Sequence, residues 1–443
     1  MTAFDEGLLS PVTAGHDDVV SDAAVADALV HAEQALVTAY FEIGILSKAD
    51  HAEIMLAFAG GARGDAVANV ETLSMIDLTA LAAAAVAGGN PVIPLVAELK
   101  ARVPEPLRSW VHRGATSQDI VDTALMIVAL SAVRRVRDSL AGVLAGLAIL
   151  ATQHGSDLVV ARTLTQHALP MTLRTRIEAW RRGVDRAVTR LATLEFPAQL
   201  AGAVGTSASF ATITGSADRA RALVQGFSGQ AGLDGPDGSW QVTRWPITEL
   251  GDALVQTIDA LGKLATDVTT LTRTEIGELS EGTGGASSAM PQKQNPVEST
   301  LIRSAALRAP QLGATLHLAA ALAVDERPDG AWHAEWPTLR ELLRLALGAS
   351  AHAASLTANL RVHPAAAIRN LAITGGLIVS ERLAITLVPL IGHERFDALI
   401  AAAAGGAELD ALVRELPEVT DLVVDALLDP AGYTGVESGV GER

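Results

Sequence analysis

The sequence predicts an all-α protein built around a central bundle of five long helices. No proline occurs between Pro106 and Pro170 or between Pro246 and Pro291, and because proline breaks helix interiors, both gaps allow very long helices. Apolar residues recur at steps of three and four within both gaps, as on the buried face of a helix. Hydrophobic residues make up 49% of the chain but aromatic residues only 3%, which suits closely packed helices better than sheets.

The elements can be followed in order along the chain. Ser21 is the expected N-cap of a first helix. Five segments are then expected to form the long helices of the bundle, namely residues 125–150, 173–194, 250–271, 295–325 and 335–360. Prolines and glycines punctuate the chain on both sides of this bundle. We therefore expect three helical domains, residues 1–110, 111–360 and 361–443.

Charge and residue usage exclude several classes of function. Lys and Arg number 33 and Asp and Glu 50, which gives a formal net charge of −17 and disfavours binding to nucleic acid or to anionic membranes. The chain has no cysteine, so it has no disulfide, thiolate metal site or cysteine nucleophile. The acidic N-terminus is unlike a signal peptide, and no apolar run is long enough to span a bilayer. A cytoplasmic protein that binds neither membrane nor nucleic acid is expected.

A segment rich in glycine and serine, residues 280–296, lies between two of the predicted long helices. Its end is suited to begin a helix, because Asn295 is a good N-cap and Pro296 fits the first helical position. Lys293 and the free amide groups of a helix start both favour a bound carboxylate. As a pattern alone, however, such a segment is more often a solvated linker, so the residues leave both interpretations open.

A second polar segment, His112-Arg113-Gly114-Ala115-Thr116-Ser117-Gln118-Asp119, precedes the first long helix. Thr116 is the expected N-cap of that helix, with Asp119 three residues later as in a capping box. This structural role for Asp119 is as well supported as a role in ligand binding. Taken alone, His112 reads as an ordinary loop histidine.

Both segments resemble conserved regions of the fumarase, aspartase and adenylosuccinate lyase superfamily. Ser287-Ser288-x-Met290-Pro291-x-Lys293-x-Asn295-Pro296 is similar to the superfamily signature, and residues 112–119 are similar to its first conserved region. The resemblance implies homotetramers in which the central bundles form a shared helical core and three subunits contribute to each active site. It implies Ser287 and His112 as catalytic residues. The substrate-binding residues that it implies are Thr116, Ser117, Arg162, Gln166, Thr206, Ser288, Lys293, Asn295 and Arg327.

Within the superfamily, the sequence most resembles the 3-carboxy-cis,cis-muconate cycloisomerase branch. Leu164 stands where fumarase and many other lyases have histidine, whereas Gln166 is kept, and residues 325–336 look like a stretch specific to this branch. The resemblance implies a small polycarboxylate substrate, 3-carboxy-cis,cis-muconate, which forms a lactone when one of its carboxylates adds to a double bond. Ser287 would transfer the proton at carbon, and neither a metal nor another cofactor is expected.

Three glutamines depart from the branch pattern and leave the substrate open. Gln292 and Gln294 replace a histidine and an arginine, and Gln241 replaces another histidine; each is a polar group able to touch a substrate. One alternative is a carbon–nitrogen lyase that releases fumarate from a succinyl-amine or from nitrosuccinate. Another is a catalytically inactive helical scaffold, which the intact Ser287, Lys293 and Asn295 set disfavours.

Overall fold

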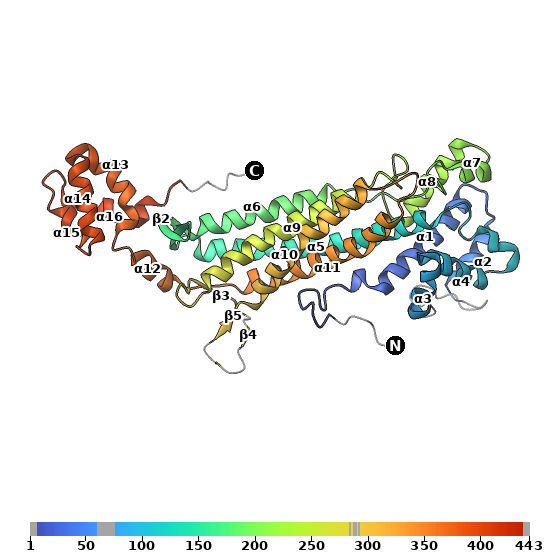
Figure 1. Ribbon diagram of the computed structural model, residues 1–443, viewed down its shortest axis with the longest axis horizontal. Helices are drawn as coiled ribbons and strands as arrows, with labels where there is room; N and C mark the ends of the chain where they lie inside the picture. The colour runs from blue at the N-terminus through green and yellow to red at the C-terminus, as the bar shows by residue number, and fades with distance from the viewer. Residues whose placement is uncertain (1–6, 60–75, 283–284, 287–289, 291–292, 437–443) are drawn as a thin grey trace. The chain divides into compact units, whose positions relative to one another are not determined.

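The computed structural model describes residues 7–59, 76–282, 285–286, 290 and 293–436 (Figure 1). These residues form an all-α fold, which confirms the predicted fold class. The helices are α1 (Asp22–Glu42), α2 (Lys48–Phe58), α3 (Leu78–Gly88), α4 (Val92–Arg102), α5 (Ser117–His154), α6 (Leu173–Ala192), α7 (Ala208–Thr214), α8 (Ala217–Ala231), α9 (Trp245–Leu271), α10 (Val297–Ala321), α11 (Gly330–Asn359), α12 (Pro364–Ala372), α13 (Ser380–Ile391), α14 (His393–Ala404), α15 (Leu409–Arg414) and α16 (Asp421–Leu428).

Short antiparallel strand pairs accompany the helices in the described part of the chain. The longest pair joins β1 (Leu158–Thr163) to β2 (Gln166–Thr172), with Leu158 opposite Thr172. The strands β3 (Leu279–Ser280) and β6 (Arg361–Val362) form a second pair. A third pair joins β4 (Gly285–Ala286) to β5 (Gln294–Asn295).

The chain divides into two compact units, each made of several stretches. Unit 1 comprises Met1–Ser139, Ala187–Asp259 and Ser304–Ala351, and unit 2 comprises Leu140–Arg186, Ala260–Arg303 and His352–Arg443. Each of the long helices α5, α6, α9, α10 and α11 contributes residues to both units. The division into residues 1–110, 111–360 and 361–443 stays a prediction.

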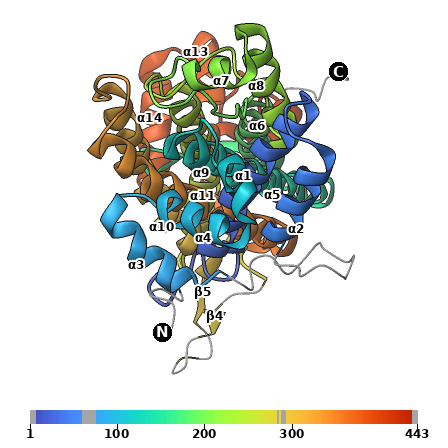
Figure 2. The same ribbon diagram turned by 90° about the vertical axis from the view of Figure 1, so that its right-hand side faces the viewer.

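In unit 1, the N-terminal helices pack against the bundle segments. Oγ of Ser21 accepts the N–H of Ala24 at 3.2 Å, which confirms the predicted cap of α1. Figure 2 shows α7 and α8 next to each other, and α8 also packs against α1. Small residues allow close approach: a Cβ on Gly348 of α11 would lie 1.9 Å from the carbonyl oxygen of Val12. The glycine is therefore required where this backbone crosses α11.

Unit 2 contains the remaining segments of the bundle helices together with the C-terminal helices. Nε1 of Trp180 on α6 donates to Oδ2 of Asp267 on α9 at 2.7 Å. A Cβ on Gly146 of α5 would lie 2.8 Å from Thr357 of α11, so α5 and α11 approach closely here. The helices α13–α16, red in Figure 1, pack around a buried apolar cluster to which Val160 of β1 and Leu371 of α12 also belong. Alanine, glycine and leucine thus build tight helix contacts, as the low aromatic content predicts.

Helices α10, α11 and α13 each contain a proline, a residue that the sequence patterns treat as a helix breaker. Pro310 lies inside α10 and Pro337 inside α11, and α11 begins at Gly330, before the expected residue 335. A single proline removes only one backbone hydrogen bond, so a long packed helix tolerates it.

Among the described residues, no single helix is both long and apolar enough to cross a membrane. The helices Pro364–Ala372 and Leu377–Ile391 reach the required length and hydropathy only when they are taken together, and the chain bends by 78° between them.

Candidate active site

The turn that leads into α5 carries three of the predicted site residues in unit 1. Gly114 has a φ of +77°, and a Cβ there would lie 2.9 Å from Cε1 of Phe210, so only glycine fits. The N–H of Thr116 donates to Oδ2 of Asp119 at 3.0 Å, as in a capping box. Helix α5 begins at Ser117, as predicted. Thr116 and Ser117 therefore occupy a helix start of fixed geometry.

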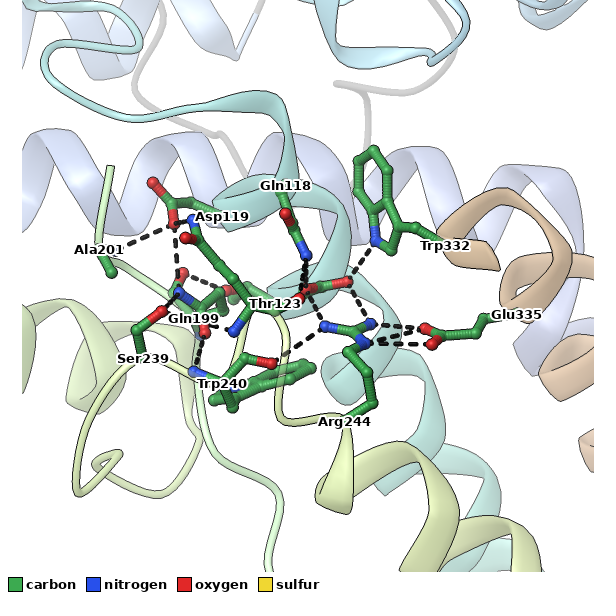
Figure 3. A network of polar contacts seen from close by, with 12 residues as sticks. Gln118, Asp119, Thr123, Gln199, Ala201, Ser239, Trp240, Arg244, Trp332 and Glu335 are labelled. Carbon is green, nitrogen blue, oxygen red and sulfur yellow. Dashed lines mark hydrogen bonds and ion pairs between the residues drawn. The ribbon is translucent and has the colours of Figure 1, made fainter. Parts of the chain in front are cut away.

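Asp119 fastens this turn to a second loop of unit 1. Its carboxylate is fully buried and also accepts the N–H groups of Ala201 at 2.9 Å and Gly202 at 3.0 Å (Figure 3). Burial raises the pKa of Asp119 to about 6, although the N–H bonds lower it in part. The loop that follows carries Thr206, which is exposed. Asp119 therefore acts as a structural anchor that keeps the Thr116 turn beside the Thr206 loop.

The buried side chain of Gln241 also contacts the backbone of the loop that carries Thr206. Its side chain is 2% exposed, and Nε2 donates to the carbonyl oxygen of Gly202 at 2.7 Å. A Cβ on Gly205 would lie 3.1 Å from Oε1 of Gln241. Gln241, a polar group that the sequence left as able to touch a substrate, is therefore a buried support of the loop backbone.

Arg327 joins the same cluster from the segment before α11. Its Nη2 donates to Oγ1 of Thr116 at 2.5 Å and to the carbonyl oxygen of Ala203 at 2.9 Å. The preceding Asp325 has a φ of +50°, which bends the chain at this point. Because guanidinium has five N–H donors, Arg327 keeps donors for an anion while it holds Thr116. The structure thus brings together two residues that the sequence places 211 positions apart.

A buried ion network supports the cluster around Thr116 in unit 1 (Figure 3). Arg244, directly before α9, donates to Asp122 of α5 at 2.7 Å and to Glu335 of α11 at 2.6 Å, and all three side chains are fully buried. Nε1 of Trp332 donates to the same Asp122 at 2.9 Å. Burial would lower the pKa of Arg244, but both carboxylates raise it above its usual value. Burial also raises the pKa of Glu335, against the opposing effect of Arg244.

His112 lies at the start of the same turn and has an acidic partner. Its Nδ1 is 2.6 Å from Oε1 of Glu33 on α1, and the Glu33 side chain is fully buried. His112 has a φ of +60°, a left-handed conformation that is uncommon for a residue other than glycine. The structure thus gives His112 a fixed orientation, which an ordinary loop histidine lacks.

In unit 2, Arg162 and Gln166 flank the turn between β1 and β2. Nη2 of Arg162 donates to Oε1 of Glu278 at 2.6 Å, so part of its guanidinium is already paired. Asn370 donates to the same carboxylate oxygen at 2.9 Å. Leu164, at the tip of the turn, is 96% exposed, and Gln166 is also exposed. Leu164 and Gln166 are therefore exposed at the turn, whereas Arg162 is held in place by Glu278.

The start of α10 differs from the expectation in one respect. The N–H groups of Glu298 and Ser299 donate to the carboxylate of Glu281 at 3.1 and 2.8 Å, and the Ser299 hydroxyl donates to it at 2.6 Å. Glu281, and not Asn295, therefore caps the helix. These amide groups already hold a carboxylate of the chain itself, because Glu281 folds back onto the helix from 17 residues away.

Lys293 and Asn295 line one cavity of unit 2, about 510 Å³ in volume. His363 forms part of its wall and makes a hydrogen bond of 2.8 Å with Oγ of Ser280. The side chain of Lys293 is exposed and that of Asn295 is half-buried. Ser287 and Ser288, the predicted catalytic pair, and Gln292 lie outside the described residues. The cavity therefore contains a cation and an amide suited to a small carboxylate.

Several supporting residues escaped the sequence analysis. Glu33, Arg244 and Glu281 act on residues 17 to 122 positions away in sequence. One signal was available: Glu33 stands between Ala32 and Leu36, within the apolar stripe of α1. A charged residue at a core position indicates a buried partner.

Comparisons with known proteins agree with this fold and site. The sequence model of the Lyase family matches residues 17–310. Nitrosuccinate lyase of Streptomyces davaonensis is 42% identical over 460 aligned positions, which cover 99% of this chain and 94% of that protein. 3-carboxy-cis,cis-muconate cycloisomerase of Bradyrhizobium diazoefficiens is 34% identical, with 85% and 87% covered. The crystal structure of 3-carboxy-cis,cis-muconate lactonizing enzyme from Pseudomonas putida has a TM-score of 0.86 at 30% identity, with 97% and 96% covered.

The family match, the helical bundle, the polar cluster around Thr116 in unit 1 and the polar cavity lined by Lys293 in unit 2 agree in indicating an enzyme of the lyase class. The chain belongs to the Lyase family, within the fumarase and aspartase superfamily, as its signature residues predict.

Proposed function

We propose that this enzyme is a carbon–nitrogen lyase that converts nitrosuccinate to fumarate and nitrite. The observation that carries the proposal is the likeness to nitrosuccinate lyase, which is higher in identity, 42% against 34%, and in coverage, 99% against 85% of this chain, than the likeness to the Bradyrhizobium cycloisomerase. Gln292 and Gln294 depart from the cycloisomerase pattern within the 280–296 segment. A changed set of polar groups in that segment supports a changed substrate.

The chemistry needs a base and a cluster of cations. A base removes a proton from the carbon next to one carboxylate, the electron pair of that C–H bond forms the double bond, and the C–N bond breaks so that nitrite leaves with its electrons. The difficult species is the doubly charged enolate of the carboxylate, which preorganised donors stabilise. Lys293 and Asn295 are suited to that carboxylate, and Arg327 beside Thr116 is suited to the second anion.

Ser287 is the proposed base, and Ser288 is its neighbour in the signature. A free serine hydroxyl is too weak a base for this step, so its ionisation requires nearby cations or amide groups. The proposed assembly is a homotetramer, in which the segments that carry Thr116, Arg162 and Lys293 come from three subunits to form each site. Ser117, Gln166 and Thr206 complete the proposed contacts with the substrate.

A second candidate is the lactonisation of 3-carboxy-cis,cis-muconate. The Pseudomonas lactonizing enzyme, with its TM-score of 0.86, and the apolar Leu164 at the tip of the β1–β2 turn favour it. In this reaction a carboxylate of the substrate adds to a double bond, and Ser287 transfers the proton at carbon. The same cations would hold a tricarboxylate.

One experiment separates the candidates. Purified protein is incubated in parallel with nitrosuccinate and with 3-carboxy-cis,cis-muconate, and fumarate, nitrite and the diene absorbance are followed. Equimolar fumarate and nitrite, absent from the Ser287→Ala variant and from the enzyme-free sample, support the proposal. Loss of the diene absorbance alone supports the second candidate. No turnover of nitrosuccinate at high enzyme concentration overturns the first.

A further inference from the structure

The pairing of His112 with Glu33 has features that a structural contact does not require. Glu33 is fully buried on α1, its Oε1 lies 2.6 Å from Nδ1 of His112, and its Oε2 has no hydrogen-bond partner among the described residues. A buried carboxylate with an unpaired oxygen destabilises a fold. Such a group is typically retained for a purpose other than stability.

The backbone around His112 is held in place by the same helix. The hydroxyl of Tyr40, seven residues after Glu33 on α1, donates to the carbonyl oxygen of Arg113 at 2.9 Å. The Tyr40 ring also packs edge-on against Trp110, with the centroids 5.6 Å apart. Residues 33 and 40 are two helical turns apart and share one face of α1. This face therefore fixes both the backbone and the imidazole of the turn.

The contact between Glu33 and Nδ1 determines which ring nitrogen of His112 is left to bind a ligand. An ionised carboxylate only accepts hydrogen bonds, so Glu33 places a proton on Nδ1 and leaves Nε2 as the ring atom that can meet a ligand. The His112 side chain is 18% exposed, so part of the ring is accessible. His112 belongs to the same turn as Thr116, which contacts Arg327. The exposed part of the ring therefore belongs to the same turn as the contact between Thr116 and Arg327, whose guanidinium is suited to bind an anion.

We propose that Glu33 is a positioning residue, which holds the imidazole of His112 so that Nε2 meets the departing group of the substrate and, in the protonated ring, donates a hydrogen bond to it. This inference rests on the proposed elimination. As the C–N bond breaks, its electron pair moves to the nitro group, and Nε2–H of the imidazolium donates to the oxygen that gains negative charge. The proton stays on Nε2, because nitrite is a much weaker base than imidazole.

A double-mutant cycle tests whether Glu33 acts through His112. The proteins are the wild type, Glu33→Gln, His112→Asn and the double variant, assayed for nitrite release from nitrosuccinate. We expect Glu33→Gln to lower kcat about tenfold with KM changed less than about twofold, because the donor acts on charge that develops in the transition state. In the His112→Asn background the same substitution is expected to change kcat less than about twofold. Equal losses in both backgrounds, or wild-type activity of Glu33→Gln, overturn the proposal.

The controls separate positioning from folding and from the proposed function. Glu42→Gln changes an exposed glutamate of the same helix, whose Oε1 accepts from Gln230 at 2.6 Å, and it is expected to keep the wild-type kcat. Glu33→Asp is a conservative variant that keeps the carboxylate. If Glu33→Gln does not fold, the His112→Asn variant alone provides the test, and a kcat equal to that of the wild type overturns the proposal. Melting temperatures of the four cycle proteins need no substrate. Non-additive changes support the pairing even where nitrosuccinate is not turned over, and additive changes overturn it.

Discussion

Nη2 of Arg327 donates to Oγ1 of Thr116 at 2.5 Å, which places a guanidinium beside the first residues of α5. We expect Arg327→Met to raise KM for the substrate about ten- to hundredfold, because a charge-assisted hydrogen bond contributes about 1.5–3 kcal/mol. Steady-state kinetics on the preferred substrate measure the effect. Arg308→Met is the matched control, since Arg308 pairs with Glu341 away from this turn. An unchanged KM in Arg327→Met would remove Arg327 from the substrate contacts.

Gly114 allows a test of the turn itself. Gly114→Ala introduces a Cβ 2.9 Å from Phe210 at a φ of +77°, so both a clash and backbone strain are expected. Gly215→Ala is a control with a φ of +83° and no atom within 4 Å, so it has the strain alone. We expect kcat/KM to fall at least about tenfold in Gly114→Ala and to stay near the wild type in Gly215→Ala. Equal activity of the two variants would contradict the proposed role of the turn.

The sequence predicted the long helices but not the contacts between them. The proline gap from 106 to 170 predicts α5, because helix formation depends on local chain geometry. Ser21 and the start of α5 at Ser117 were likewise predictable from capping rules. Asn295 was assigned the cap of α10 by the same rules, but Glu281 competes for it through a return of the chain that no local rule contains.

The candidate site residues show the same limit, because their contacts with distant residues could not be predicted. Thr116 and Lys293 were identified by motif, but the partners that orient such residues are distant in sequence. Arg244 bonds to a carboxylate 122 residues away, and Glu33 to a histidine 79 residues away. Periodicity shows only which face of a helix is buried, and not which residue of another helix it meets.

Asp119 predicts a pH dependence of stability. Burial raises its pKa from 3.8 to about 6, so the folded state binds the carboxyl proton more tightly than the unfolded state does. Its stabilising contribution is therefore fully present below about pH 3.8 and is lost as the pH rises through about 6. Two pKa units correspond to about 3 kcal/mol. We expect the wild type to lose stability relative to Asp119→Asn over this window, as followed by melting temperature at constant ionic strength.

The control for this pH series is Asp218→Asn, at an exposed aspartate of unit 1 whose partner is Arg221. Its stability profile is expected to run parallel to that of the wild type, because an exposed pair contributes little. A parallel profile for Asp119→Asn would show that the carboxylate does not titrate in this range.

Arg244 is expected to be the most sensitive of the supporting residues. Arg244→Met leaves Asp122 and Glu335 buried without their counter-ion, and the loss of one partner from a buried ion network costs about 3–5 kcal/mol. Arg221→Met makes the same change at an exposed pair and should leave the melting temperature close to that of the wild type. Urea unfolding of both variants measures the difference. A small effect in Arg244→Met would mean that the carboxylates become protonated or find other partners.

Glu281 connects the start of α10 to the residues that precede it. In Glu281→Gln one of the two carboxylate oxygens becomes an amide nitrogen, which cannot accept the N–H of Glu298 or Ser299. Loss of a helix cap costs about 1–2 kcal/mol, and Asn295 lies two residues before α10, so its position depends on this end of the helix. We therefore expect a higher KM together with a lower melting temperature. Glu394→Gln, in the first turn of α14 where no side chain caps the helix, is the matched control and should change neither value. A wild-type KM in a destabilised Glu281→Gln would show that the cap stabilises α10 without positioning Lys293 and Asn295.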